Sequence, residues 1–411
     1  MLIALALRNI WRVPRRTICT LLAVSFTTAV LVFFQSLQFS TYATTINAST
    51  SIFQGHLQVQ DQNYAEKPQI RNSINDSENI LMAIEKIPGI DSITSRAMAF
   101  ALASSAERTY GIQVVGVETE QEKKLSSIPG TIMVGSYLNS TAENTAVIGE
   151  ALARNLKITV GGELTLLGQS YDGSLAASVV KIVGIFRSGS VDIDRGLIEI
   201  PLQQFQEIFS MGNKIHTIVI KSANIREVAA LQKDIKIALS HIQNSTQPVR
   251  ILRWDELMPG LKESIDLDYA SSWLFFSSLI LIVCFTILNT FLMSVLERTR
   301  EFGIMLAIGC TPMRISILIC IESLLLTGMG ILFGASIGAL IVLYFIQYGF
   351  HIPGSEEIMQ MWNISMAIYP QITLQSITIS PAIIFIVAFL SSLYPAIRIW
   401  KLEPVTAIRS T

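Results

Sequence analysis

LFFSSLILIVCFTILNTFLMSVL at Leu274–Leu296 and the ERTREFGIMLAIGCTPMR that follows it at Glu297–Arg314 decide the fold of this chain. The first stretch has no Asp, Glu, Lys or Arg, and at about 1.5 Å per residue a helix of its length crosses a hydrocarbon core of about 30 Å. The second places charged residues around an apolar middle, Phe302–Ile308, which is typical of a short helix against a membrane face or another protein. Another long apolar stretch begins at Ile315. The sequence therefore predicts two membrane spans joined by one short helix.

The composition and the other apolar blocks predict a membrane protein with four spans. Hydrophobic residues make up 51% of the chain and charged residues 15%, against about 25% charged residues in ordinary soluble domains. The net charge of −1 favours no polyanionic partner. The apolar blocks predict transmembrane helices at 17–39, 271–296, 315–348 and 381–397.

Lys and Arg near the span ends predict which segments face the cytoplasm. Arginines precede the first block, occur within 297–314 and follow the fourth block, whereas the loop 349–380 has no Lys or Arg. By the positive-inside rule the segments 1–16, 297–314 and 398–411 are cytoplasmic. The segments 40–270 and 349–380 are then extracytoplasmic, because only that placement lets four spans alternate.

The segment 1–16 predicts a short amphipathic helix with a basic face. Arg8 and Arg12 lie among apolar residues, which is typical of a helix on the cytoplasmic lipid surface, and an equally good interpretation is that the arginines only set the topology. The first apolar block is longer than the core of a signal peptide, and no A-x-A site follows it. We therefore expect an uncleaved anchor.

Residues 40–270 predict an α+β domain. A strand–helix–strand pattern occurs near the start of this region, with strands at 55–60 and 93–103, and again near its end across 216–252. Between them lie mostly strands and turns, so we expect two discontinuous halves with a β-rich insertion near 126–213. The region has no cysteine and needs a conventional core, because all four cysteines lie in or beside the spans: Cys19, Cys284, Cys310 and Cys320.

The third apolar block carries a doubled G-x-x-x-G pattern, Gly330, Gly334 and Gly338, which permits close helix packing. We expect this packing to occur within the chain, and a dimer face is the alternative. Glu322 is the one acidic residue of the block. We expect it to reach the cytoplasmic interface or to pair with a neighbouring helix.

Motifs for catalysis, metal binding and nucleic-acid binding are absent from the sequence. No G-x-x-x-x-G-K-[ST] pattern occurs, so we expect no ATPase on this chain. Basic residues show no stripe interleaved with aromatic residues, so nucleic-acid binding has no support. There is no H-E-x-x-H and no Cys–His cluster, and the histidines are scattered singly, which favours structural roles: His56, His216, His241 and His351.

Three parts of the sequence carry a family resemblance. The run ERTREFGIMLAIGCTPMRISILICIESLLL at Glu297–Leu326 resembles the signature of FtsX-like permeases of MacB-type (type VII) ABC transporters, and YPAIRIWKLEPVTAIR at Tyr394–Arg409 is similar to the ending they share. GHLQVQ, IEKIPGIDSI and AVIGEALARNLKITVGGELTL resemble the MacB-like periplasmic core domain. The resemblance covers essentially the whole chain, and within the family the outer region is most similar to lipoprotein-releasing permeases of the Gram-negative inner membrane.

The resemblance implies a non-catalytic permease subunit that pairs with a second copy or a paralogue and binds two copies of a separate ABC ATPase. ATP and Mg would bind to that ATPase, and nucleotide-driven motion would pass outward through the long helices without substrate crossing the membrane. A periplasmic lipoprotein carrier or an adaptor, and membrane lipid, are the further partners implied. The candidate substrate cavity lies at the outer ends of the first two spans: Phe33, Phe34, Leu37, Leu274 and Phe275.

We expect Glu301–Gly309 to be the coupling helix that docks into the ATPase. Glu301 would meet a basic or backbone donor at the rim of the partner's groove, Gly303 would allow close approach, and Gly309 would give a sharp helix end. Ala307 also belongs to this segment. The remaining residues are apolar and would fill the groove: Phe302, Ile304, Met305, Leu306 and Ile308. The alternative is a segment that only lies in the lipid interface.

Three functions fit these features. The leading one is extraction of a lipid-anchored or amphipathic substrate from the outer leaflet and its transfer to a periplasmic carrier. The second is tripartite efflux of peptides or drugs with an adaptor, and the third is an FtsX-like signalling permease that regulates a cell-wall hydrolase or a sensor kinase. Neighbouring genes discriminate among them, since each function requires a different companion protein.

Overall fold

The computed structural model of this chain describes residues 2–140, 144–240, 248–351, 354 and 367–400. It divides into two compact units, which we call the helical unit and the sheet unit. The helical unit comprises Met1–Tyr42, Ser264–Ile352 and Ala367–Thr411, and the sheet unit comprises Ala43–Glu263 and Pro353–Met366. The predicted cytoplasmic tail from 401 onwards and most of the predicted loop 349–380 lie outside the described residues.

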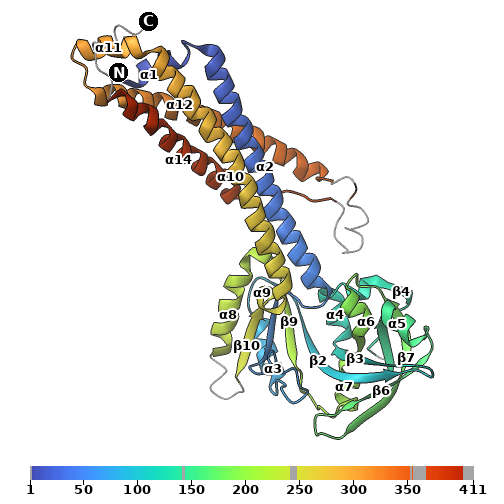
Figure 1. The fold of residues 1–411 in the computed structure, drawn as a ribbon. Helices are drawn as coiled ribbons and strands as arrows, with labels where there is room; N and C mark the ends of the chain where they lie inside the picture. The colour runs from blue at the N-terminus through green and yellow to red at the C-terminus, as the bar shows by residue number, and fades with distance from the viewer. Residues whose placement is uncertain (1, 141–143, 241–247, 352–353, 355–366, 401–411) are drawn as a thin grey trace. The chain divides into compact units, whose positions relative to one another are not determined.

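The helical unit contains short helices and long helices (Figure 1). The short ones are α1 (Leu2–Ile10) and α11 (Thr299–Ala307). The long ones are α2 (Pro14–Ile52), α10 (Pro259–Glu297), α12 (Pro312–Tyr348) and α14 (Leu374–Ile399), of which α2 from Ala43 on and α10 up to Glu263 belong to the sheet unit. All four long helices are apolar enough to cross a membrane, which confirms the predicted fold class of four transmembrane helices with a large α+β domain.

The long helices extend beyond the apolar blocks that predict them. Helix α2 continues past the end of its block at Phe39 as far as Ile52, and α10 begins at Pro259, well before its block, as its polar start suggests. Helix α14 begins earlier than predicted because Thr373 caps it, accepting the Ser376 N–H at its Oγ1 over 3.2 Å. The blocks mark only the part of each helix whose side chains suit hydrocarbon, since the backbone hydrogen bonds of a helix do not require apolar side chains.

The core of the helical unit joins all of its helices. Two hydrogen bonds link α2 to α14: Ser36 Oγ donates to Ser376 Oγ over 3.0 Å, and Ser380 Oγ donates to Gln35 Oε1 over 2.7 Å. The buried apolar side chains between the helices include Ile10, Val24, Leu31, Phe276, Ile287, Phe302, Ile319, Ile384 and Ile399. The short helices α1 and α11 are therefore packed parts of this unit.

The sheet unit is built on one ten-stranded sheet with helices around it (Figure 1). Its strands are β1 (Leu57–Asp61), β2 (Ile90–Ser104), β3 (Thr109–Val117), β4 (Ile132–Gly135), β5 (Thr145–Gly149), β6 (Glu163–Gln169), β7 (Leu175–Phe186), β8 (Leu197–Pro201), β9 (Thr217–Ser222) and β10 (Val249–Arg253). Its helices are α3 (Ser77–Ile84), α4 (Thr119–Leu125), α5 (Glu150–Leu156), α6 (Val191–Gly196), α7 (Leu202–Ile208), α8 (Val228–Ser240) and α9 (Trp254–Leu257), with 3-10 turns at Ile128–Thr131 and Ile225–Glu227.

One part of the sheet is an antiparallel layer covered by two helices. Its strands run in the order β10-β1-β9-β2. Helices α3 and α8 pack on it through apolar residues that recur at helical spacing, among them Ile80, Ile84, Leu231, Ile235 and Leu239. The strand–helix–strand patterns predicted at the two ends of the region are thus confirmed, and they lie side by side in one layer.

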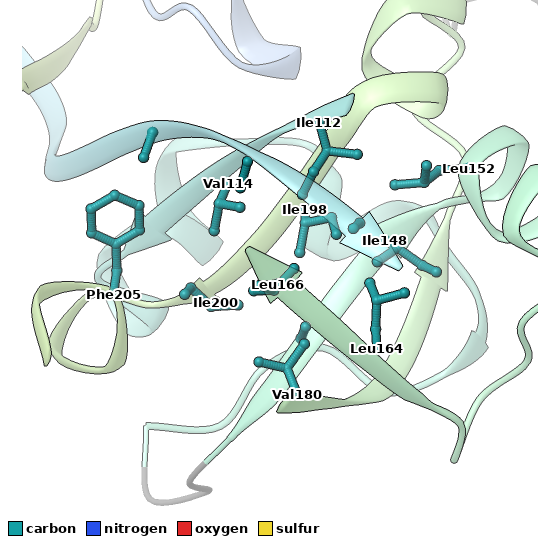
Figure 2. Close-up of a cluster of buried hydrophobic side chains, with 14 of the residues drawn as sticks. Ile112, Val114, Ile148, Leu152, Leu164, Leu166, Val180, Ile198, Ile200 and Phe205 are labelled. Carbon is teal, nitrogen blue, oxygen red and sulfur yellow. The ribbon is translucent and has the colours of Figure 1, made fainter. Parts of the chain in front are cut away.

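The other part of the sheet closes into a barrel. Strand β2 pairs with β3 and β6, β6 with β7, β7 with β5, β5 with β8, and β8 with β3. Figure 2 shows the side chains that fill it, including Ile112, Val114, Ile148, Leu164, Leu166, Val180, Ile198 and Ile200. The segment 126–213 is β-rich as predicted, but it does not form a sheet of its own, because β8 pairs with β3 and β6 pairs with β2 to close the barrel.

Candidate coupling site

Helix α11 follows α10 and precedes α12 in the chain, and Gly309 stops it just after its last residue, Ala307. Gly309 has φ of +99°, in the left-handed region that favours glycine. Its N–H donates to the Leu306 carbonyl over 3.1 Å, and the Cys310 N–H donates to the Met305 carbonyl over 3.0 Å, the pair of bonds of a Schellman motif. Pro312 then begins α12. The sharp helix end predicted at Gly309 is confirmed.

One face of α11 packs inside the helical unit. Phe302 has no exposed surface and belongs to the unit's core, and Gly303 is also buried. Met305 and Leu306 are partly buried against the same core. The prediction that all five apolar residues of this helix fill a groove on a partner is therefore wrong for Phe302, because the chain's own helices cover it.

The opposite face of α11 is exposed and apolar. Ile304 is 44% exposed and Ile308 is 80% exposed. The two residues are four positions apart, so their side chains lie on the same side of a helix. Ala307 and Gly309 beside them are also exposed. The surface available to a partner is thus narrower than predicted, and we call Ile304, Ala307 and Ile308 the outward face.

Arg298, between α10 and α11, connects three groups in the helical unit. Its Nε lies 3.2 Å from Glu301 Oε2, and its Nη1 lies 3.3 Å from both carboxylate oxygens of Glu322 on α12. The guanidinium also stands 5.1 Å from the centre of the Phe302 ring. The predicted pairing of Glu322 with a neighbouring helix is confirmed. The sequence contains these residues 24 positions apart, so no local pattern could reveal the contact.

The N-terminal segment joins the same network. Asn9 on α1 donates from Nδ2 to Glu322 Oε1 over 2.5 Å, and Arg12 pairs with Glu301 over 2.6 Å. Arg16 at the start of α2 pairs with Glu297 at the end of α10 over 2.9 Å. Glu301, expected to meet a donor on a partner, is thus already held by this chain. Burial raises the pKa of Glu301, but hydrogen bonds from Arg298 and Arg12 outweigh it and lower the pKa below its ordinary value.

The glycines of α12 pack against α2. A Cβ atom at Gly330 would lie 2.8 Å from Val24 Cγ1, one at Gly334 would lie 2.7 Å from Thr28 Cβ, and one at Gly338 would lie 3.0 Å from the Ala29 carbonyl oxygen. Ser25 Oγ donates to the Gly330 carbonyl over 2.9 Å across the same contact. The doubled G-x-x-x-G pattern is thus used within the chain, as expected.

The predicted substrate cavity is only partly assembled. Phe34, Leu37 and Phe275 line one groove of about 570 Å³ between α2 and α10, with the rings of Phe34 and Phe275 6.0 Å apart. At the polar end of this groove the Tyr42 hydroxyl donates to Asp268 over 2.7 Å. Phe33 instead faces Phe345 and Phe350 on the other side of α2, and Leu274 is 75% exposed and does not line the groove.

The described histidines of the sheet unit are structural, as predicted. His56 Nδ1 accepts the Ser222 N–H over 3.1 Å, and His216 Nδ1 accepts the Met98 N–H over 2.9 Å. Burial lowers the pKa of both imidazoles to about 4, which keeps them neutral. Within the described ranges no group of three or more His, Cys, Asp or Glu is placed to hold a metal ion.

Family models match residues in both units of this chain. The family of the FtsX-like permease C-terminal matches residues 273–404, and the family of the MacB-like periplasmic core domain matches residues 17–238. The chain is 21% identical over 360 residues to a lipoprotein-releasing system transmembrane protein LolC of Neisseria meningitidis serogroup B, covering 84% of each chain. It is 23% identical over 346 residues to a LolE of Haemophilus influenzae, covering 81% of this chain and 80% of that one.

A solved structure of the periplasmic region of MacB from Actinobacillus actinomycetemcomitans matches 52% of this chain and 94% of its own, at 12% identity and a TM-score of 0.37. The profile of the periplasmic core alone spans more than half of the sequence, and the permease profile covers the helices that hold α11. The chain therefore belongs to the FtsX-like, MacB-type permeases of ABC transporters, with a MacB-like periplasmic core domain.

Proposed function

We propose that this chain is the permease subunit of an ATP-driven transporter that extracts lipoproteins, or another lipid-anchored amphipathic substrate, from the outer leaflet of a Gram-negative inner membrane. The observation that carries the proposal is the division of α11 into a face fixed inside the helical unit and an outward face exposed for a partner. The similarity to LolC and LolE proteins across four fifths of the chain supports lipoproteins as the substrate class.

The coupling mechanism follows from how α11 is held. Phe302 fixes it to the core, and Arg298 and Arg12 tie it to α12 and to the N-terminal segment. A force on the outward face then displaces the long helices as a group, since the short helix cannot swing freely. Two states that differ by a few kcal/mol could be interconverted by ATP binding and hydrolysis on a partner.

The proposed function requires several partner proteins. Two copies of a separate ABC ATPase hold ATP and Mg, and each docks on one outward face. A second copy of this chain or a paralogue completes the permease, and a periplasmic lipoprotein carrier receives the substrate. The groove beside Phe34 and Phe275 is apolar with a polar end at Tyr42 and Asp268, which suits an acyl chain with a polar head group.

Ile308→Trp is expected to weaken binding of the ATPase strongly. A groove shaped for isoleucine cannot accept an indole, and loss of a central apolar anchor typically costs about 2 kcal/mol or more, roughly thirtyfold in affinity. A helix that only lies in the lipid interface would accept tryptophan well, because Trp favours that layer. The measurement is pull-down and titration of the partner ABC ATPase, with the permease in nanodiscs.

Val191→Trp is the matched control, since Val191 is 70% exposed on α6 of the sheet unit. It should leave ATPase binding unchanged. Gly303→Trp is unsuitable for this test, because Gly303 is buried and an indole there disturbs the chain's own packing. Unchanged affinity for Ile308→Trp would show that the outward face does not dock.

The topology gives a separate prediction. In a variant without its four cysteines, Glu66→Cys in the sheet unit should react with an impermeant thiol reagent in intact spheroplasts, and Arg300→Cys on α11 should react only after lysis. Both positions are exposed. Ser127 is a poor labelling position, since its side-chain oxygen is buried. Labelling of Arg300→Cys in intact spheroplasts would reverse the orientation.

A further inference from the structure

Arg96 lies where the two parts of the sheet meet. Strand β2 pairs with β9 from Ile90 to Arg96 and with β3 from Arg96 to Ser104. The residue therefore belongs to the antiparallel layer and to the barrel at once. Its side chain is 1% exposed, which makes it one of the largest fully buried side chains of the described chain. A buried guanidinium at this point requires partners for its charge and its donors.

The partners of Arg96 come from two other segments. Its Nε and Nη2 donate to the two oxygens of Glu122 on α4, over 3.0 and 2.5 Å, and Glu122 has no exposed side-chain surface. Its Nη1 donates to the carbonyl of Phe53, the residue that follows α2, and its guanidinium stands 4.1 Å from the centre of the Phe53 ring. Glu122 thus holds the arginine in the orientation that reaches the end of α2.

The end of α2 belongs to the sheet unit and is capped by other residues of that unit. The last carbonyls of a helix lack partners within it. Here the Thr50 carbonyl accepts the Gly55 N–H, the Ser51 carbonyl accepts the Ser127 N–H over 2.8 Å, and the Ile52 carbonyl accepts Ser126 Oγ over 2.8 Å. Arg96 supplies the next donor, to Phe53. The bonds from Ser126 and Ser127 join the helix end to the segment after α4, and the bond from Arg96 joins it to β2.

The strand order gives Arg96 a mechanical consequence. Helix α2 leads into β1, which is separated from β2 by β9 in the order β10-β1-β9-β2. A displacement of the end of α2 reaches the barrel through Phe53, which packs with Met98 of β2 in one buried cluster, and through the bonds from Ser126 and Ser127. Arg96 adds a charged contact from the helix end to β2 itself. The contact is charged and buried, and the two bonds to Glu122 fix the guanidinium in one orientation.

We propose that Arg96, oriented by Glu122, is a positioning residue that couples movement of α2 to the barrel of the periplasmic domain during substrate release. The inference rests on the proposed function, because it presupposes that α2 moves when the ATPase acts. It adds a site on the periplasmic side where the transmission can be broken without touching the ATPase contact.

The test replaces the pair by apolar side chains, as Arg96→Met together with Glu122→Met. Such a replacement of a buried ion pair is often neutral for stability, whereas removal of one partner leaves an unpaired charge. The permease and its partner ABC ATPase are reconstituted in proteoliposomes with a fluorescent triacylated lipopeptide as probe. We expect hydrolysis within about twofold of wild type and ATP-dependent release of the probe reduced roughly tenfold.

The matched control is Arg187→Met with Glu150→Met, which removes a bidentate but exposed pair at 2.7 and 2.8 Å on the barrel side of the same unit. This control variant should release the probe at the wild-type rate. Arg96→Lys provides a second variant that keeps the buried charge paired but loses the forked geometry that reaches Phe53, and its release should also fall.

The outcomes separate the two proposals. If the wild-type complex releases no probe, the proposed function fails for this substrate class. If the wild type releases the probe and a stably folded Arg96 variant releases it at the same rate per ATP, the coupling role of Arg96 is overturned.

Discussion

Gly334→Ala is expected to destabilise the helical unit by about 1–3 kcal/mol, the usual effect of one extra methyl group in a closely packed interior. The added Cβ would lie 2.7 Å from Thr28 Cβ and 2.9 Å from Ser25 Cα, and it would also overlap the Ser25 carbonyl oxygen. These are mostly backbone atoms of α2, which cannot move aside without shifting the helix. The measurement is thermal unfolding of the full-length protein in detergent, followed by intrinsic fluorescence and by size-exclusion chromatography.

Gly328→Ala is the control on the same helix. A Cβ at Gly328 meets no atom within 4 Å, so this variant should be as stable as wild type or slightly more stable, because alanine favours the helix. Equal melting temperatures for the two variants would mean that α2 and α12 are not packed as closely as described. A larger substitution, Gly334→Leu, should prevent recovery of folded protein.

The features that the sequence could predict are those set by local pattern. Apolar blocks predicted the four long helices, the glycine repeat predicted a close contact of α12, and a glycine after an apolar run predicted the end of α11 at Gly309. Each depends on residues within a few helical turns of one another. The strand–helix–strand patterns at the ends of residues 40–270 were predictable for the same reason.

The features that could not be predicted depend on contacts far apart in sequence. Closure of the barrel requires β6 to pair with β2, and no pattern in either strand specifies the other. Phe302 lies in a short segment between two spans, where the sequence does not indicate burial. Only the fold shows that its ring joins a buried cluster with residues of α10, α12 and α14. The burial of Arg96 and Glu122 follows from the strands and helices that pack around them, and no pattern in the sequence marks either residue as buried.

Helix α11 illustrates both limits. The family resemblance predicted a role in docking, and the apolar residues of the segment suggested one continuous contact surface. The fold divides those residues between an inward face that fixes the helix and an outward face of Ile304, Ala307 and Ile308.

Stability of the sheet unit is expected to fall as the pH rises from about 5 to 8, because of Glu199. This carboxyl is fully buried on β8, and Tyr137 donates to its Oε2 over 2.8 Å, while its Oε1 has no hydrogen-bond partner among the described residues. Burial, and then the negative charge of Glu122, raise the pKa of Glu199 to about 8, against the opposing effect of Arg96. Arg96 is already paired with Glu122, so a second carboxylate at this point has no cation of its own.

The direction of this change in stability with pH follows from how many protons the folded and unfolded states bind. The unfolded chain releases this proton near the ordinary pKa of 4.5, whereas the folded chain keeps it until about pH 8. Between these values the folded state binds more protons, so the free energy of unfolding decreases with rising pH, by at most about 1.4 kcal/mol per pH unit for one proton. The contribution is complete below pH 4.5 and lost above pH 8, and both melting temperature and denaturation midpoint of the full-length protein should report it.

Glu199→Gln is the variant that isolates this effect. Glutamine matches the protonated carboxyl in shape and charge, so the variant should be about as stable as wild type at pH 5 and more stable at pH 8.5, with the slope between them removed. Glu150→Gln provides the comparison, since Glu150 is partly exposed, is paired with Arg187 and has a pKa lowered by that hydrogen bond. Its variant should keep the wild-type slope between pH 5 and 8. An unchanged slope in Glu199→Gln would show that Glu199 is already ionised in the folded protein, and that the buried site tolerates two carboxylates beside a single arginine.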